Sequence, residues 1–177
     1  METKMRGKAW IFQGLLDVDW EICPFETLRQ LRERGVNPTY EELGKYAMTK
    51  VDPEFPKKVN KGDFIVAGEG MGYGHDHDHA CISLRGAGVA AVVCESSNSN
   101  FLRNCMDHGL PLIQCRGINA IVREGDELEI DLKSGIVKNL RSGEQLSFPP
   151  FPPFLLEMIQ DGGLYPHLEK RIRSNQF

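Results

Sequence analysis

The chain has 177 residues, of which 41% are hydrophobic and 26% are charged, and its formal net charge at pH 7 is −4. These values predict one globular domain over residues 1–177, without the basic stripe of a nucleic-acid-binding protein and without the roughly 18-residue apolar run of a membrane span. No apolar signal segment stands at the start, and the five dispersed cysteines lack C-x-x-C spacing, so we expect a protein of the reducing cytoplasm without a disulfide framework.

The first third of the chain predicts a strand, a helix and a long connection. Residues 8–22 indicate a strand followed by a turn around Asp17–Asp19. Residues 24–35 indicate a helix, because apolar side chains recur at helical spacing, a proline fits the first turn and a glycine fits the end. Residues 36–60 are polar and contain three prolines, so we expect a mobile loop with one helical turn within 39–47.

The middle of the chain alternates strands and helices. The segments GDFIVAG, GVAAVVC and LPLIQC, at 62–68, 88–94 and 110–115, are apolar runs typical of strands that are covered on both faces. Between them we expect a helix that starts near His79 and a helix over 98–109 that ends in glycine. This alternation predicts a parallel sheet.

The last third predicts antiparallel strands and a terminal helix. Apolar residues alternate along 126–132, and the segments 135–140 and 144–148 follow across glycine turns, which indicates a meander. Residues 152–163 predict a helix with proline at its start and glycines at its end. The predicted fold class is therefore α/β, with mixed parallel and antiparallel strands and helices.

The segment GYGHDHDHAC, residues 72–81, concentrates three histidines and two aspartates. It follows a predicted parallel strand and precedes a helix, which is where ligands bind in such folds and where backbone N–H groups favour an anion. Alternating glycines before the histidines let the backbone come close to a ligand. We therefore expect an anionic substrate at this loop.

Three interpretations of the loop stay open on the residues alone. In the first, His75 or Asp76 is a general acid or base, because an unperturbed imidazole pKa of ~6.5 suits proton transfer. In the second, a transition metal is bound by His75 with His77 or with His79, although no conventional zinc spacing is present. In the third, an aspartate caps the helix and His79 packs in the core, which is the favoured interpretation for His79 alone.

Two other groups of polar residues have structural and functional interpretations. Ser97 or Ser99, after the second strand of the parallel set, would cap the next helix or help to bind an anion. The side chains of Arg85, Arg103 and Arg116 would be surface charges, or one of them would hold a carboxylate.

Four stretches resemble a known family: residues 62–80 and 15–22, compared below, and residues 88–113 and 124–171. Residues 62–80, GDFIVAGEGMGYGHDHDHA, are similar to the G-D-x-[IV]-[IV]-A-G-x-N-F-G-x-G-S-S-R-E-H-A segment of 3-isopropylmalate dehydratase small subunits and related aconitase-type swivel domains. Residues 15–22, LLDVDWEI, stand where the family has N-I-D-T-D-x-I. The resemblance covers most of the chain and is weakest over 25–60. It implies a swivelling β/β/α domain like the fourth domain of aconitase.

The resemblance also implies a partner and a reaction. Such small subunits pair with a large subunit whose cysteines carry a [4Fe–4S] cluster, and together they move water across a hydroxy di- or tricarboxylate. The cysteines of this chain have no cluster-like spacing. We therefore expect no cofactor in this chain, an Fe–S large subunit as partner, a small carboxylate as substrate, and neither nucleic acid nor membrane.

The chain departs from the family where the chemistry takes place. The family's base serine is His75 here, its second serine is Asp76 and its substrate-binding arginine is His77, whereas Asp19 matches the family's site aspartate. Arginine clamps a carboxylate through two hydrogen bonds, which a histidine does not, and Asp76 repels a carboxylate. The usual substrate of the family is therefore expected to bind poorly.

The favoured prediction is a hydro-lyase small subunit with altered substrate choice, with His75 and Asp19 as catalytic residues. The predicted substrate-binding residues are Gly74, Asp76, His77 and Ser97. No metal is predicted, and the weaker alternative places one on His75 and His77. The alternative function is a non-catalytic swivel-like domain that binds a metal or serves as a partner scaffold. An independent single-chain enzyme is disfavoured, because no other nucleophile–base or carboxylate pair stands out.

Overall fold

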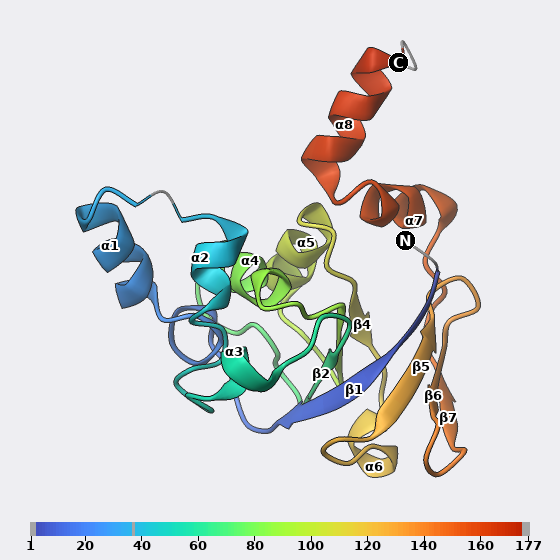
Figure 1. Ribbon diagram of the computed structural model, residues 1–177. Helices are drawn as coiled ribbons and strands as arrows, with labels where there is room; N and C mark the ends of the chain where they lie inside the picture. The colour runs from blue at the N-terminus through green and yellow to red at the C-terminus, as the bar shows by residue number, and fades with distance from the viewer. Residues whose placement is uncertain (1–2, 37, 175–177) are drawn as a thin grey trace.

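A seven-stranded sheet in the order β4-β3-β2-β1-β5-β6-β7 forms the framework of the protein (Figure 1). The computed structural model describes residues 3–36 and 38–174. The strands are β1 (Lys4–Phe12), β2 (Phe64–Ala67), β3 (Ala91–Cys94), β4 (Leu112–Gln114), β5 (Glu127–Asp131), β6 (Ile136–Asn139) and β7 (Gln145–Ser147).

The long strand β1 joins two kinds of sheet. Its first half pairs antiparallel with β5, Met5 opposite Ile130, and its second half pairs in parallel with β2, Ala9 opposite Phe64. Parallel pairing continues through β3 to β4, and antiparallel pairing continues through β6 to β7. The predicted mixture of a parallel core and an antiparallel meander is therefore confirmed.

Five of the nine helical elements in the described residues match predicted segments, the predicted helical turn within 39–47 among them, and four were not predicted as helices. The bounds of all nine are η1 (Val18–Ile22), α1 (Phe25–Glu33), α2 (Tyr40–Gly44), α3 (Phe55–Lys58), α4 (His79–Gly86), α5 (Ser99–Asp107), α6 (Ile118–Ile121), α7 (Pro153–Gln160) and α8 (Leu164–Arg173). The predictions of α1, α5 and α7 are confirmed, and α4 begins at His79 as predicted. The elements α3, α6 and α8 were not predicted, and the π-helix η1 stands where a turn was expected. No helix within the described residues is long and apolar enough to cross a membrane.

Both faces of the parallel half are covered by apolar groups. Along β2, the side chains of Ile65 and Ala67 belong to one core, and those of Phe64 and Val66 belong to another. The first core includes residues of α4 and α5, and the second includes residues of α6 and of the antiparallel strands. This arrangement explains why the strand sequences are apolar throughout rather than alternating.

The connection over 36–60 is more structured than a bare loop. It contains α2, at the place of the predicted helical turn, and α3, and it buries Leu43, Met48 and Phe55. Asn37 lies outside the described residues, and the mobility of this segment stays a prediction.

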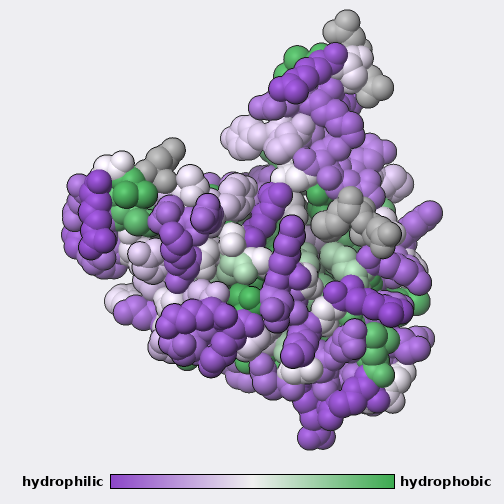
Figure 2. Space-filling view, viewed as in Figure 1, coloured by the Kyte–Doolittle hydropathy of each residue, from purple (hydrophilic) through white to green (hydrophobic). Residues whose placement is uncertain are grey.

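The C-terminal helix α8 projects from the body of the protein (Figure 1). It has no buried residue among those described, and the face shown in Figure 2 is largely hydrophilic, α8 included. The helix α8 was not predicted from the sequence, although its apolar residues Leu164, Leu168 and Ile172 recur at helical spacing.

Candidate active site

The site lies where β1, β2 and β3 end at the carboxyl edge of the parallel half. The loop after β2 is held against the segment after β1, because the Tyr73 N–H donates to Leu16 O (3.1 Å) and the Val18 N–H donates to Tyr73 O (2.9 Å). The same loop is held against the segment after β3, because the Asn98 N–H donates to Met71 O (2.9 Å). Three chain segments that are distant in sequence are thereby fixed side by side.

The π-helix η1 presents Asp19 to the histidine loop. Its N-cap is Asp17, whose Oδ1 accepts the Asp19 N–H at 2.7 Å, and the Asp17 N–H donates to Glu21 at 2.9 Å. These short contacts fix the direction of the first turn. Single π-helical turns are common at functional sites, and this one aims the Asp19 carboxylate at the loop.

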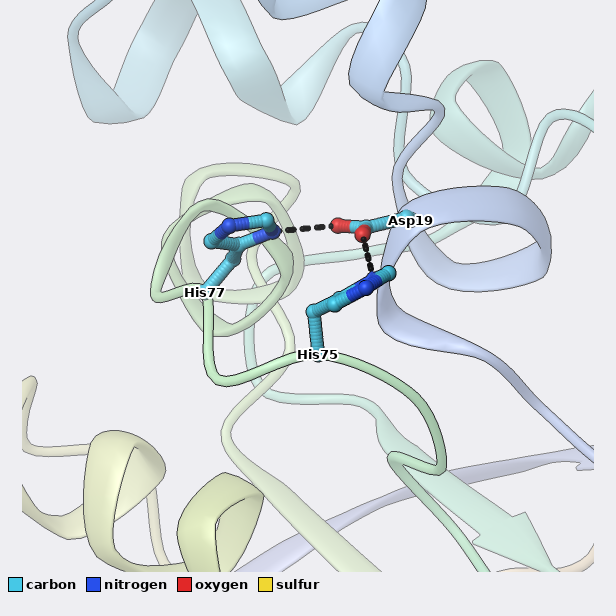
Figure 3. A group of neighbouring side chains, drawn as sticks. All are labelled: Asp19, His75 and His77. Atoms are coloured by element: carbon cyan, nitrogen blue, oxygen red, sulfur yellow. Dashed lines mark hydrogen bonds and ion pairs between the residues drawn. The ribbon is translucent and has the colours of Figure 1, made fainter.

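The Asp19 carboxylate binds two histidines at once (Figure 3). The distance from Oδ2 to His75 Nδ1 is 2.8 Å, and the distance from Oδ1 to His77 Nδ1 is also 2.8 Å. Because a carboxylate only accepts, each Nδ1 carries a proton, and in the neutral ring Nε2 then carries the lone pair. The Asp19 side chain is 13% exposed, whereas His75 is 79% and His77 is 42% exposed. A partly buried acid therefore orients two more accessible imidazoles.

Aromatic contacts hold the two imidazole rings. The His77 ring stacks on Phe25 with centroids 5.2 Å apart and an interplanar angle of 20°, and the His75 ring lies 5.5 Å from the His77 ring. Phe25 is the first residue of α1, a segment interpreted from the sequence only as a helix with apolar side chains at helical spacing. The sequence signal that could have placed Phe25 at the site is its position a few residues after Asp19 in the chain.

His79 is a core residue, as the sequence predicted. It is 2% exposed, and its Nε2 donates to Cys23 O at 2.9 Å. Burial lowers the pKa of His79, and the hydrogen bond to the carbonyl offsets only part of this effect. The neutral ring then carries its proton on Nε2, which lies 3.6 Å from Asp19 Oδ1.

The expected aspartate cap of α4 is wrong. Asp78 occupies the N-cap position, but its side chain makes no capping hydrogen bond. Its Oδ2 instead lies 3.3 Å from His108 Nε2, and this contact holds the pKa of Asp78 below its usual range. His108, which lies 30 residues away in the chain, binds the Asp78 carboxylate in place of the backbone N–H groups of α4.

Asp76 belongs to the loop, and its side chain bonds residues of α5. Its two carboxylate oxygens accept hydrogen bonds from Arg103 Nη2 (3.1 Å) and from Asn104 Nδ2 (2.9 Å), both on α5. Arg103, interpreted as a surface charge or a carboxylate clamp, is therefore next to the loop and is engaged by Asp76.

Gly74 belongs to the loop itself, directly before His75, and Ser97 belongs to the segment that follows β3. Gly74 has φ +103°, and a Cβ built there would lie 2.3 Å from Asp17 Oδ2. Ser97 Oγ accepts the Gln114 Nε2–H at 2.9 Å. The predicted cap of α5 by Ser97 or Ser99 is wrong, because Asn98 is the N-cap and accepts the Asn100 N–H at 2.8 Å.

A cavity of about 480 Å³ adjoins Asp19. Exposed aromatic groups form its apolar wall, and it contains one lysine and one glutamate; the lining residues are Asp19, Trp20, Pro24, Phe25, Glu26 and Lys50. Glu26 is paired with Arg29 at 2.8 Å. The sequence interpretation missed Trp20 and Lys50, although Trp20 directly follows the site aspartate.

The cysteines of this chain do not fit an iron–sulfur cluster. All five are buried. Burial raises the pKa of Cys23 and of Cys94 to about 12, which disfavours the thiolate form that binds a cluster. Among the described residues, the ligand-forming group of three or more side chains contains Asp19, His75 and His77 and no cysteine.

Comparison with known proteins gives close relatives over nearly the whole chain, although no protein-family model matches. The isopropylmalate/citramalate isomerase small subunit of Methanocaldococcus jannaschii is 42% identical over 176 residues, 99% of this chain and 100% of the relative. The 3-isopropylmalate dehydratase small subunit of Pyrobaculum calidifontis is 43% identical over 167 residues, 94% of this chain and 98% of the relative. The crystal structure of 3-isopropylmalate dehydratase from M. jannaschii superposes with a TM-score of 0.85 at 31% identity, over 98% of this chain and 99% of that chain. The chain therefore belongs to the family of 3-isopropylmalate dehydratase small subunits.

Proposed function

We propose that this chain is the small subunit of a hydro-lyase in which a histidine, oriented by Asp19, has taken over the base role. The observation that carries the proposal is the paired contact of Asp19 with His75 and His77. It leaves Nε2 of the exposed His75 free to accept a proton, at the position that resembles the family's base serine.

His75 would act through its oriented ring. With Nδ1–H donated to Asp19, Nε2 takes the proton from the carbon next to a substrate carboxylate, the C–H electron pair forms the double bond, and the hydroxyl on the adjacent carbon leaves with its bonding pair. A proton from solvent converts this hydroxide into water, and the His75 imidazolium later returns its proton to solvent. Asp19 stabilises the imidazolium that forms and holds the ring in the productive tautomer. The reverse sequence hydrates the double bond.

The remaining predicted residues would bind and position the substrate. In its protonated form, His77 donates Nε2–H to a carboxylate while Nδ1–H stays on Asp19. Ser97 Oγ accepts from Gln114, so that its own O–H is available to an anion. Gly74 lets the loop pass against Asp17, whereas Asp76, the fourth predicted residue, occupies Arg103 instead of contacting the substrate.

The cavity next to Asp19 supports a substrate with an apolar substituent. Trp20 and Phe25 offer apolar surface, and Lys50 offers a cation to a carboxylate. The relatives are named for isopropylmalate, an alkyl-substituted hydroxy dicarboxylate, and for citramalate. We propose a hydroxy di- or tricarboxylate with an apolar group as the substrate class.

We propose a large subunit as the partner, because the curated relatives are named as small subunits. The [4Fe–4S] cluster would be carried by that large subunit, since the cysteines of this chain do not fit one. The free cysteines agree with a reducing compartment, and we place the complex in the cytoplasm.

The test is a turnover assay of the assembled complex. The chain is co-expressed with the large subunit of its own source, the cluster is reconstituted anaerobically, and the ultraviolet absorbance of isopropylmaleate, citraconate and related unsaturated dicarboxylates is followed. We expect hydration of at least one of them and its loss in His75→Ala.

The matched control is His167→Ala. His167 also bonds an aspartate through Nδ1, Asp161 at 2.7 Å, but it lies on the projecting helix α8. Full turnover in His75→Ala contradicts the base role. Absence of turnover in a folded complex with an intact cluster favours the non-catalytic alternative.

A further inference from the structure

We propose that Asp19, His75 and His77 also form a binding site for a divalent transition-metal ion of the Zn²⁺ or Co²⁺ type. The site uses the same side chains as the proposed base, but the argument for metal binding rests on the arrangement of donor atoms alone. It holds whether or not the complex is a hydro-lyase.

The donor atoms lie close to the spacing that one ion requires. Each Nδ1 is 2.8 Å from an Asp19 oxygen, and one ligand atom from each of the three residues lies within 4.8 Å of the other two. Two ligands bound at ~2.0–2.1 Å to a tetrahedral ion are roughly 3.3 Å apart. Small rotations of the two imidazole rings therefore open the contacts enough to admit an ion (Figure 3).

The chemistry of the three donors selects the class of ion. Two imidazole nitrogens and one carboxylate oxygen suit zinc and its first-row neighbours, whereas Ca²⁺ and Mg²⁺ prefer oxygen ligands alone. Three protein ligands leave at least one coordination position open, and both histidines are accessible to solvent. The open position is suited to water or to a carboxylate oxygen.

The ligands are held by outer contacts that do not need to change. The Asp19 N–H is fixed on Asp17 Oδ1, the His77 ring is stacked on Phe25, and the His79 N–H beside Asp19 is bonded to Cys23 O. Such supporting contacts raise metal affinity because they preorganise the ligands. The carboxylates of Asp17 and Asp19 also favour a cation at this point of the surface.

Metal binding and the base role exclude each other at His75. In the metal-free site Nδ1 holds the ring proton and Nε2 holds the lone pair. When Nδ1 binds an ion, its proton moves through solvent to Nε2, so that neither ring nitrogen can accept a proton from a substrate. On the proposed function, the ion therefore inhibits turnover by occupying the base.

The test is isothermal titration calorimetry with ZnCl₂ on the full chain, purified without a histidine tag and treated with a chelator. We expect one ion per chain, with the affinity reduced roughly ten-fold or more in each of Asp19→Asn, His75→Ala and His77→Ala. His167→Ala is the matched control and should bind as the unmodified chain does. Absorption spectra with Co²⁺ should report nitrogen and oxygen ligands without thiolate.

Two results would overturn the proposal: no binding by the unmodified chain, or the same affinity in His77→Ala as in the His167→Ala control, which would show an adventitious ion elsewhere. Urea unfolding of each variant confirms that a lost site is not a lost fold. The calorimetry needs no large subunit, so it tests the metal site independently of the hydro-lyase activity. Either proposal can therefore be contradicted while the other holds. If the chain binds zinc but the assembled complex shows no turnover, the metal site is supported and the base role of His75 is contradicted.

Discussion

Asp76 and Arg103 form an ion pair at 3.1 Å that ties the histidine loop to α5, with Asn104 Nδ2 donating to the second carboxylate oxygen at 2.9 Å. Both partners are substantially solvent-exposed, so the pair adds little to stability, about 0–1 kcal/mol. Its consequence is functional: the guanidinium that lies next to the loop is occupied by a side chain of the loop itself. In the resembling family, an arginine in this loop binds the substrate instead.

Asp76→Ala should release Arg103 and remove a negative charge from the loop. We expect the KM for a dicarboxylate substrate to fall about 5- to 10-fold, which corresponds to one exposed charge-assisted hydrogen bond of about 1 kcal/mol or slightly more. Steady-state kinetics of the assembled complex measure this. The gain should vanish in the double variant Asp76→Ala/Arg103→Ala, and a gain that persists there would contradict the role of Arg103.

Asp19→Asn should remove the paired acceptor at the centre of the site. The amide offers one oxygen, so that only one of the two Nδ1–H groups keeps a partner and the orientation of His75 is lost. We expect kcat to fall about 10²- to 10⁴-fold with a smaller change in KM, the range that a positioned general base contributes. Asp52→Asn is the control, since the Asp52 carboxylate lies outside the site and accepts the backbone N–H of Glu54, which an amide oxygen also can. An unchanged kcat in Asp19→Asn would contradict the proposed orientation of His75.

Gly74→Ala should distort the loop for two reasons that a control can separate. A left-handed φ of +103° is strained for alanine, by about 1–2 kcal/mol, and the new Cβ would lie 2.3 Å from Asp17 Oδ2. Gly143→Ala carries only the first cost, because Gly143 has φ +80° and open space around its Cβ position. Both variants should lose stability in urea unfolding, and only Gly74→Ala should also lose turnover. Equal turnover in the two variants would show that the approach to Asp17 is unimportant.

Much of the fold follows from local patterns, and the site does not. Continuous apolar runs predict β2 and β3 because both faces of these strands are buried, and the alternation along β5 predicts the meander because one face is buried. The position of β1 in the sheet depends on pairing with strands more than fifty residues away. The local pattern of apolar residues contains no information about such pairing. The contact of Asp19 with His75 spans 56 residues in the same way, and only the resemblance of two short motifs brought these residues together in advance.

Asp126 should make stability depend on pH at the junction of β5 and β6. It is buried, and its carboxylate accepts hydrogen bonds from the Arg123 N–H (2.9 Å), Asn139 Nδ2 (2.7 Å) and Arg141 Nη2 (3.1 Å). Burial raises the pKa of Asp126, but these hydrogen bonds outweigh burial and hold the pKa below its ordinary value. The folded state therefore resists protonation more than the unfolded state does.

The sign of the effect follows from this difference in the pKa of Asp126. The stabilisation is complete above the unfolded carboxyl pKa, about 3.9, and is lost as the pH falls through the lower folded pKa. Asp126→Asn should lower the free energy of unfolding near neutral pH by about 1–3 kcal/mol, because a buried hydrogen-bonded charge is removed. Urea unfolding at about pH 7 and about pH 3 should show that the difference between the unmodified chain and Asp126→Asn shrinks at the lower pH. A difference that stays constant would mean that Asp126 keeps the same protonation in the folded and unfolded chains.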